Sequence, residues 1–487
     1  MISALLVTNR HIRAGLISCS YFLFDFYIGH LHIEFIHDAK GNDMAIDEHI
    51  DPRLLRAVFA TSLLDGLALF DLTVFGFFAA IIGDRFFPFT EPMTSLLLVG
   101  ATFGVGFFAR PLGALLLGAY ADRRGRLRAL ILSCWLAALG TAALAVCPTY
   151  EHIGMAAPLA FVVARLLQGF AVGGEIGSAA ALMIEAAPSS RRGFLLGCQL
   201  AGHGLAPFFA ATLCALLGNV LMPAQLFDWG WRLAFAMGLP LIGVAYYLRL
   251  QLQARGAFED IAPPDDRFRP IVQLFRHRRV FLICATILMG FRTAPLYAIV
   301  HLVLAYVTNR IIDKPMQVGL LAAAFSGALI AALSPVAGMV IDKLARRKPV
   351  LFVCIGGTAL GVYLLFAAMT KATGAAAFVI GIASITALIV LGGCASTVLL
   401  LEAVPRSERA TAYGAAYALG AGVFGSTAPL AVTASMKWTA DPLSVGWYLV
   451  ACCLLGACAA MAIKECGLGA DGSRAESGSA WGVQRKN

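Results

Sequence analysis

Twelve long apolar runs limit the possible fold of this chain more than any other feature of its sequence. Each run is long enough to cross a bilayer as an α-helix, which needs about 20 mostly apolar residues, and the charged residues gather between the runs. Only 13% of all residues are charged, about half of the share found in soluble domains. The sequence therefore predicts an all-α membrane protein with twelve transmembrane helices.

The longest polar segment between the runs separates six runs from six. We therefore predict an N-terminal six-helix bundle over residues 56–251, a cytoplasmic linker over 252–279 and a C-terminal six-helix bundle over 280–464. The predicted spans cover residues 56–83, 94–120, 128–147, 156–186, 194–217, 231–251, 280–308, 316–341, 349–370, 376–404, 409–434 and 445–464.

The ends of the chain differ in composition from the two bundles. Within the N-terminal extension, residues 1–55, the semi-apolar stretch 17–36 carries charged side chains that a hydrocarbon core tolerates badly. We expect residues 1–43 to be disordered or to reflect a start-site error, with Met44 as the start of the native protein. The Gly- and Ser-rich tail, residues 465–487, is predicted to be disordered.

Two sequence patterns recur in the same order, and at nearly the same offset, in both predicted bundles. They are Gly118-x-x-x-Asp122 with Gly338-x-x-x-Asp342, and Glu185-x-x-Pro188-x-x-x-Arg192 with Glu402-x-x-Pro405-x-x-x-Arg409. A general bias of loops towards Pro and Arg does not explain the matching order and spacing. With six spans in each copy, the two bundles have the same orientation in the membrane, which is the parallel kind of repeat found in transporters.

Basic residues gather in alternate predicted loops, beginning with the loop that holds Arg123, Arg124, Arg126 and Arg128. The loops between them hold few lysines and arginines. Basic loops of multi-pass proteins stay in the cytoplasm. This pattern, with an even number of spans, predicts that both termini and the linker are cytoplasmic.

Both copies of the Gly-x-x-x-Asp pattern end an apolar run at a basic cluster. Salt bridges from such residues to neighbouring helix ends can hold one conformational state closed. A solvated run of charge would explain the arginines but not the repeated Gly-x-x-x-Asp. The predicted cytoplasmic gate comprises Gly118, Asp122, Arg123, Gly125, Arg126, Glu185, Arg192, Asp342, Arg346, Glu402 and Arg409.

Ionisable residues inside the spans indicate the transport site, because a charge is costly in a hydrocarbon core and is retained there for function. Arginine presents a planar fork that binds a carboxylate with two bonds. A desolvated carboxylate can exchange a proton near neutral pH. We predict substrate binding by Arg110, Arg165, Arg232 and Arg292, and proton coupling by Asp71 and Glu175.

Several of these residues also have a structural interpretation. Asp71, Arg165 and Glu175 can form a buried ion network. Arg232 lies beside two tryptophans and can reach the membrane interface instead. His203, in the fifth span, fits a hydrogen bond between helices better than a proton relay.

Glycines recur along the second and fourth spans, with Gly106, Gly113, Gly169 and Gly173 among them. Small residues let helix backbones approach closely in membranes. We therefore expect close helix contacts along both spans.

The composition offers no site for a metal or a cofactor. The twelve cysteines lie mostly within apolar runs, as Cys134, Cys214 and Cys452 do, and they lack the Cys-x-x-Cys or Cys/His spacing of metal ligands. We interpret them as small core residues and expect no disulfides. The net charge of +9 follows the loop pattern and does not indicate a nucleic-acid partner.

The chain resembles the major facilitator superfamily, because the segment 118–126 is similar to the signature loop between its second and third spans. A combination of motifs is similar, more narrowly, to the metabolite:proton symporter family. These motifs are Phe86-Phe87-Pro88, Arg110-Pro111-Leu112-Gly113, Arg165-Leu166-Leu167-Gln168-Gly169 with Gly173-Gly174-Glu175, Trp229-Gly230-Trp231-Arg232, Glu402-Ala403-Val404-Pro405 with Arg409, and Tyr417-x-x-Gly420-x-x-x-Phe424-Gly425-x-x-x-Pro429. The resemblance covers about residues 56–464.

The resemblance implies a bacterial inner-membrane transporter in which two bundles rock by alternating access. Members of that family import small carboxylates or zwitterions such as citrate, 2-oxoglutarate, shikimate, proline and betaine with protons. The family pattern in the first span is only half present. Asp71 and Phe70 match it, but Leu69 replaces an aromatic residue and Ala68 stands where glutamate is usual. Asp65 lies one turn before Ala68, on nearly the same helix face.

We therefore predict a monomeric, proton-coupled importer of a small di- or tricarboxylate-like acid, whose partners are the metabolite, the proton and the lipid bilayer. A zwitterion importer is the alternative within the same class. A receptor or structural membrane protein would not need arginines inside its spans. An enzyme would need a nucleophile–base or metal-ligand set, and the spans contain none.

Overall fold

The computed structural model describes residues 52–88, 92–254, 269–310, 315–370, 375–439 and 443–465. The predictions for residues 1–43 and for residues 466–487 lie outside the described residues. The helix α2 begins at Pro52, within the predicted extension, and Glu465, the first residue of the predicted tail, accepts a hydrogen bond from the backbone N–H of Lys348 at 3.2 Å. The helices of the first half are α2 (Pro52–Phe77), α3 (Ala79–Phe86), α4 (Pro92–Arg124), α5 (Arg126–Val146), α6 (Tyr150–Ile153), α7 (Ala156–Ala186), the 3-10 turn η1 (Ser189–Arg191), α8 (Arg192–Val220), α9 (Pro223–Gln225), the π-turn η2 (Leu226–Gly230), α10 (Trp231–Ala236) and α11 (Gly238–Ala254).

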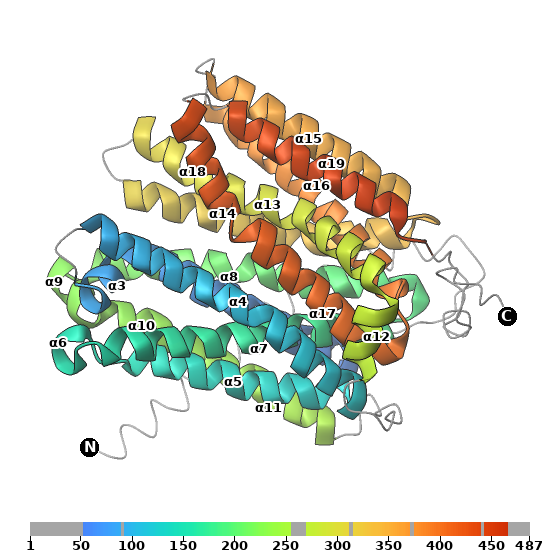
Figure 1. Ribbon diagram of the computed structural model, residues 1–487, viewed down its shortest axis with the longest axis horizontal. Coiled ribbons are helices and arrows are strands. Elements are labelled where there is room, and N and C mark those ends of the chain that lie inside the picture. Colours follow the sequence, from blue (N-terminus) through green and yellow to red (C-terminus); the bar gives the residue numbers. More distant parts are fainter. Residues whose placement is uncertain are drawn as a thin grey trace. The chain divides into compact units, whose positions relative to one another are not determined.

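The second half repeats this arrangement after an additional helix. Its elements are α12 (Arg269–His277), α13 (Arg279–Arg310), α14 (Pro315–Asp342), α15 (Lys348–Thr370), α16 (Ala375–Glu402), the 3-10 turn η3 (Arg406–Glu408), α17 (Arg409–Gly420), the π-turn η4 (Ala421–Gly425), α18 (Ala428–Thr439) and α19 (Leu443–Ala462). In Figure 1 the helices of the first half, α2 to α11, are blue to green, and those of the second half, α12 to α19, are yellow to red.

Within the described ranges, 10 helices are long and apolar enough to cross a membrane. They match the predicted spans two to ten and span twelve. The first predicted span corresponds to α2 and α3, and the eleventh to α17 and α18, with a π-turn between these two. The prediction of an all-α membrane protein is confirmed.

Local sequence explains several helix boundaries. Pro52, Pro92, Pro223 and Pro315 each occupy the first position of a helix, where the missing N–H of proline has no partner to lose. Gly125 separates α4 from α5 with a φ of 102°, a backbone conformation that favours glycine. A single glycine therefore makes the sharp turn in the signature segment.

The additional helix, α12, lies in the segment that the sequence analysis treats as a linker. Its face towards the protein includes the buried Leu274, whereas Arg276 and His277 are exposed. It contacts α4, α13 and α17, and Figure 1 shows it beside α17 at the end of the bundle opposite α3, α6 and α9.

Arg278, directly after α12, donates from Nε to Glu408 Oε2 at 2.7 Å. Burial raises the pKa of the Glu408 carboxyl, and the Arg278 guanidinium opposes that rise.

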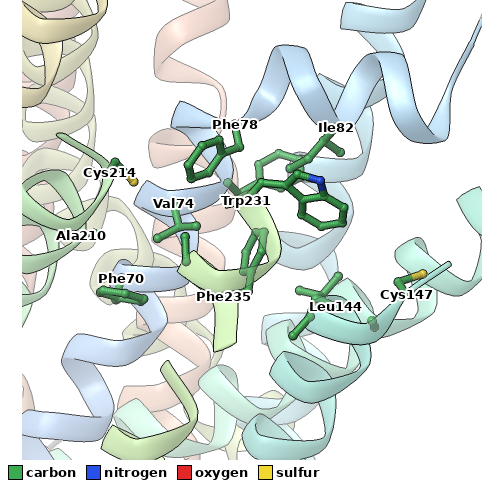
Figure 2. Close-up of a cluster of buried hydrophobic side chains, with 14 of the residues drawn as sticks. Phe70, Val74, Phe78, Ile82, Leu144, Cys147, Ala210, Cys214, Trp231 and Phe235 are labelled. Carbon is green, nitrogen blue, oxygen red and sulfur yellow. The ribbon is translucent and has the colours of Figure 1, made fainter. Parts of the chain in front are cut away.

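A large apolar core holds the first half together (Figure 2). Trp231 is fully buried at its centre, with its ring edge-on to Phe86 at a centroid distance of 5.7 Å. Val74 of α2 and Leu144 of α5 lie in the same cluster, as does Cys214 of α8, so this cysteine packs as a core residue as predicted.

The outer faces of the helices are also apolar, and Leu139, Val353 and Leu360 are 61%, 68% and 60% exposed. Such faces suit contact with lipid chains.

Glycines bring α4 and α7 into backbone contact. A Cβ atom at Gly113 would lie 1.9 Å from the carbonyl oxygen of Phe170, and one at Gly173 would lie 2.0 Å from that of Arg110. A Cβ atom at Gly169 would likewise lie 2.0 Å from the carbonyl oxygen of Gly106. The close contacts expected from the glycine pattern are therefore present, and they fix the position of Arg110 on α4.

Replacing Gly113 with alanine is expected to lower the free energy of unfolding by about 1–3 kcal/mol, because overpacking forces two backbones apart. Gly104, on the same helix, has open space where its Cβ would be. Gly104→Ala is therefore the matched control and should leave stability unchanged or raise it by up to about 1 kcal/mol. Thermal unfolding of the purified variants in detergent measures both effects. Equal melting temperatures for the two variants would contradict the contact.

Candidate functional site

The two halves of the protein contact each other where the helices end at the basic loops. We call this end the basic end. There α4 and α7 contact α17, and α8 contacts α14 along its length. The two contacts join equivalent helices of the repeat, because α4 and α14 carry the two Gly-x-x-x-Asp patterns. The halves are therefore joined by a pseudo-symmetric pair of contacts.

Asp122, at the end of α4, binds the N-terminus of α17 in the other half. Its carboxylate accepts hydrogen bonds from the backbone N–H of Ala410 at 3.0 Å and of Thr411 at 2.8 Å. The hydroxyl of Thr411 donates to it at 2.5 Å, and Arg126 forms an ion pair with it. A helix N-terminus offers free N–H groups and partial positive charge, so a carboxylate is stabilised there.

Asp342, at the end of α14, makes the same contact in the opposite direction. It accepts hydrogen bonds from the backbone N–H of Gly193 at 2.6 Å and of Phe194 at 2.7 Å, at the N-terminus of α8. Gly338 lies beside Gly193, and a Cβ on Gly338 would be 2.2 Å from the carbonyl oxygen of Gly193. The repeated glycine thus lets the helix ends approach closely enough for the aspartate to reach. A Cβ on Gly118 would meet Thr411 in the same way, at 2.9 Å from its Cα.

The repeated glutamates add ion pairs between the halves. Glu185 of the first half binds Arg126 with two bonds, of 3.0 and 3.2 Å, and also accepts from Arg409 of the second half at 3.2 Å. Glu402 of the second half accepts from Arg192 of the first half at 3.3 Å. We call these carboxylates, with Asp122, Asp342 and their partners, the latch.

At one position of the predicted gate, the structure brings a neighbouring residue to the contact in place of the predicted one. The equivalent of Arg126 in the second half is Arg347, which is almost fully buried and donates to Glu402 at 3.1 Å. Arg346, the predicted residue, is exposed. The connection between α14 and α15 is longer than the single Gly125 between α4 and α5, so the arginine that reaches Glu402 comes one residue later. Arg123, another residue of the predicted gate, has a buried Nε atom without a hydrogen-bond partner.

Polar side chains of both halves also meet near the middle of the helices. Arg110 of α4 is buried, its guanidinium lies 3.9 Å from the ring centroid of Phe107, and its Nε has no hydrogen-bond partner. The charge of Arg110 acts on His203 of α8, and so does that of Arg292 of α13 in the other half. Asp65 of α2 lies 3.9 Å from His203. These groups define a polar centre between the halves.

The second half lines the polar centre with hydroxyl groups. Arg292 donates to Thr397 of α16 at 3.3 Å and lies 5.9 Å from the ring centroid of Tyr417 of α17. Thr397 and Tyr413 are 3.2 Å apart, within hydrogen-bond distance. Neither Arg110 nor Arg292 forms an ion pair with a carboxylate in the part of the chain that the structure describes. The polar centre therefore presents two guanidinium groups and several hydroxyl groups.

The predicted residues Asp71 and Arg165 form a separate cluster inside the first half. Asp71 accepts hydrogen bonds from Thr141 at 2.8 Å and from Gln168 at 2.5 Å. Arg165 donates to the same Gln168 at 3.0 Å, and its guanidinium lies 4.2 Å from the ring centroid of Phe75. Gln168 thus connects the carboxylate and the guanidinium. One oxygen of Asp71 and two nitrogens of Arg165 are buried without a partner.

Glu175, the other predicted proton carrier, is held in an ion pair. Both of its oxygens accept hydrogen bonds from Arg249 of α11, which is fully buried. Arg249 also donates to the carbonyl oxygen of Leu130 at 2.7 Å. Arg249 is not among the residues predicted from the sequence, although it is a charged residue within the last turn of a predicted span.

Arg232 lies apart from the other predicted substrate residues. It donates to the carbonyl oxygens of Asp228 at 3.0 Å and of Cys147 at 2.9 Å. Nearby, Arg85 forms ion pairs with Glu151 and Asp228. The structure therefore places Arg232 among connecting segments, as its interfacial interpretation suggests, and it brings Arg110 and Arg292 towards a common centre instead.

Comparison with known proteins gives the family of the chain. Residues 61–429 match the model of the Major Facilitator Superfamily. This chain belongs to the major facilitator superfamily. It is therefore a multi-pass membrane protein with the fold of a secondary transporter, and the resemblance noted in its sequence is confirmed.

Its relatives include transporters of several acids and zwitterions. It is 30% identical to the citrate-proton symporter of Klebsiella pneumoniae, over 80% of this chain and 88% of that protein. It is 32% identical to the alpha-ketoglutarate permease of Escherichia coli, over 82% and 90%. It is 29% identical to the proline/betaine transporter of Escherichia coli, over 85% and 84%.

A solved structure with the same fold is that of the proton:xylose symporter XylE bound to 6-bromo-6-deoxy-D-glucose. The TM-score is 0.69 at 16% identity, and the match covers 86% of this chain and 98% of that one. This similarity concerns the fold of the chain.

The latch predicts a specific pattern of amide exchange. Asp122→Ala removes the acceptor of the Ala410 and Thr411 amides, and their hydrogen exchange should become roughly 10- to 100-fold faster, since a bond to a charged group contributes about 1.5–3 kcal/mol. Asp342→Ala is the matched control and should accelerate the amides of Gly193 and Phe194 instead. Hydrogen–deuterium exchange with mass spectrometry on the intact protein measures both peptides. Unchanged exchange at both sites would contradict the latch.

Proposed function

We propose that this chain imports a small organic acid, driven by an inward flow of protons across the bacterial inner membrane. The observation that carries the proposal is the pair Arg110 and Arg292, two guanidinium groups from opposite halves that have no carboxylate partner among the described residues. A fork-shaped cation without a carboxylate partner is suited to bind a carboxylate of the substrate. The relatives of the chain include a citrate-proton symporter, which supports this class of substrate.

The proposed orientation places the basic end in the cytoplasm, with both termini and α12 on that side, because basic loops remain inside. In this orientation the latch closes the cytoplasmic end of the protein. Substrate would then enter from the opposite side, and release would require the four backbone hydrogen bonds of Asp122 and Asp342 to break. The fold suffices for this movement within one monomer, since both halves lie in one chain. No enzyme activity is proposed.

We assign the coupling proton to Asp71 rather than to Glu175. Both oxygens of Glu175 are bound by Arg249, and such a pair stabilises the ionised form of the carboxyl group. Asp71 is hydrogen-bonded by the uncharged groups of Thr141 and Gln168, and one of its oxygens has no partner. Its carboxyl group is therefore freer to gain and lose a proton.

Import of a zwitterion such as betaine or proline is a second candidate, and Asp65 favours it. An ionised carboxylate close to the two arginines would bind the cationic group of a zwitterion while an arginine binds its carboxylate. A substrate panel of succinate, citrate, 2-oxoglutarate, proline and betaine in proteoliposomes separates the two candidates.

Proteoliposomes with the purified protein should accumulate an acid of this panel when the outside is made acidic, and a protonophore should abolish the accumulation. Asp71→Asn should lose accumulation but keep exchange of labelled for unlabelled substrate, because exchange needs no net proton transfer. Uptake of labelled substrate with and without the gradient measures both. Accumulation that persists in the presence of the protonophore would contradict proton coupling.

Arg110→Gln and Arg292→Gln should each reduce substrate affinity by roughly 10- to 100-fold, since a hydrogen bond to a charged group contributes about 1.5–3 kcal/mol. Arg124→Gln, at an exposed position in the basic segment, removes the same charge outside the site and should leave affinity unchanged. Substrate titration of transport in proteoliposomes gives the affinities. Normal affinity in both Arg110→Gln and Arg292→Gln would exclude the polar centre as the site.

A further inference from the structure

Asp65 is a buried carboxylate with a hydrogen-bond donor on one oxygen and none on the other. The side-chain amide of Gln199 donates to Oδ2 at 2.5 Å, whereas Oδ1 has no partner. The amide oxygen of Gln199, Oε1, is also buried without a partner. Asp65 Oδ1 and Gln199 Oε1 are therefore two buried acceptors that lack a donor. Burying an acceptor without a hydrogen bond costs free energy in apolar surroundings.

One proton on Asp65 supplies the missing donor. An ionised carboxylate only accepts hydrogen bonds, whereas a protonated one has an O–H donor. A carboxylic acid and a primary amide each offer a donor and an acceptor, so Gln199 can hold Asp65 in its protonated form as well as in its ionised form.

The charged groups that act on Asp65 come from α7, α8, α11 and α13. On α8, His203 Nε2 lies 3.9 Å from Oδ2. The charges of Glu175 on α7, Arg249 on α11 and Arg292 on α13 also act on Asp65, but Glu175 and Arg249 bind each other. The helices α3 and α10 contact α2 as well, and their charged residues are Asp84, Arg85 and Arg232.

Protonation of Asp65 changes the charge that a substrate meets in the polar centre. With Asp65 ionised, its negative charge offsets one of the two positive charges of Arg110 and Arg292. With Asp65 protonated, both positive charges are uncompensated. A monoanion matches the first state, and a dianion matches the second.

We propose that Asp65 takes up a proton when a dicarboxylate dianion binds at Arg110 and Arg292. The proton comes from the aqueous phase and is held at the carboxyl group of Asp65 by Gln199, so that charge is balanced without breaking the Glu175–Arg249 pair. The proposal rests on the proposed function and narrows its substrate to acids that bind as dianions. It also separates the two candidate functions, since a zwitterion needs the ionised form of Asp65.

Succinate binding to the full-length protein in lipid nanodiscs tests this inference. Calorimetry in two buffers of different ionisation enthalpy gives the number of protons taken up per succinate bound. The wild type should take up about one proton more than Asp65→Asn, which is neutral at every pH. Succinate affinity of the wild type should fall by up to about tenfold per pH unit as Asp65 ionises, whereas that of Asp65→Asn should lose this dependence.

The comparison with Asp65→Asn cancels any proton that binds at Asp71. Asp84→Asn changes an exposed carboxylate of α3 and is the control that should match the wild type. Equal proton uptake by wild type and Asp65→Asn would overturn the inference and leave the proposed function intact. Succinate that fails to bind the wild type overturns the inference alone if another acid of the panel is transported, and overturns the proposed function too if none is.

A second measurement does not depend on the folding of Asp65→Asn. Infrared difference spectra of the wild type should show the carbonyl band of a newly protonated carboxylic acid when succinate binds. Gln199→Leu removes the hydrogen bond to Asp65 and should shift that band, while Asp84→Asn should not. A band that is absent, or that Gln199→Leu leaves in place, would overturn the inference.

Discussion

The binding of a carboxylate to the helix N-terminus of the opposite half is the interaction on which the rest of this structure depends. Asp122 and Asp342 each accept two backbone N–H groups that have no partner within their own helix. The partial positive charge of the helix end compensates the buried negative charge. These directional bonds close the basic end, and contacts of this kind can break and form again as the halves rock.

The two carboxylates need helices that approach at the distance of backbone contact. Gly118 and Gly338 supply that distance at the latch, and Gly113 and Gly173 supply it between α4 and α7. The same close packing positions Arg110, which lies one turn along α4 from the glycine contacts. Latch and polar centre are therefore mechanically connected through α4, because a movement of α4 at the basic end also moves the guanidinium in the middle of the protein.

The sequence predicted some residues of the candidate site and missed others. Arg110 and Arg292 were predicted because a charge inside an apolar run requires a function, and the structure brings them to one centre. Gln199 was overlooked, since a neutral polar residue in a span indicates no role until its neighbour is known. Arg249 was overlooked although it is charged; it lies in the last turn of its predicted span. Arg346 was named in place of Arg347 because a strict repeat of sequence does not fix the length of a connection. The roles of these residues in transport remain predictions.

The sequence by itself determined that the chain spans a membrane with helices, that it consists of two similar halves, and which loops are basic. These properties follow from run length, from repeated spacing and from the cost of charge in lipid, and none of them requires a knowledge of contacts. The tertiary structure decided which charges are paired. Glu175 found a partner in Arg249, whereas Asp65 and Arg110 retained buried atoms without one. The pairing of a buried charge depends on side chains from helices that are distant in sequence, and only their packing brings these together.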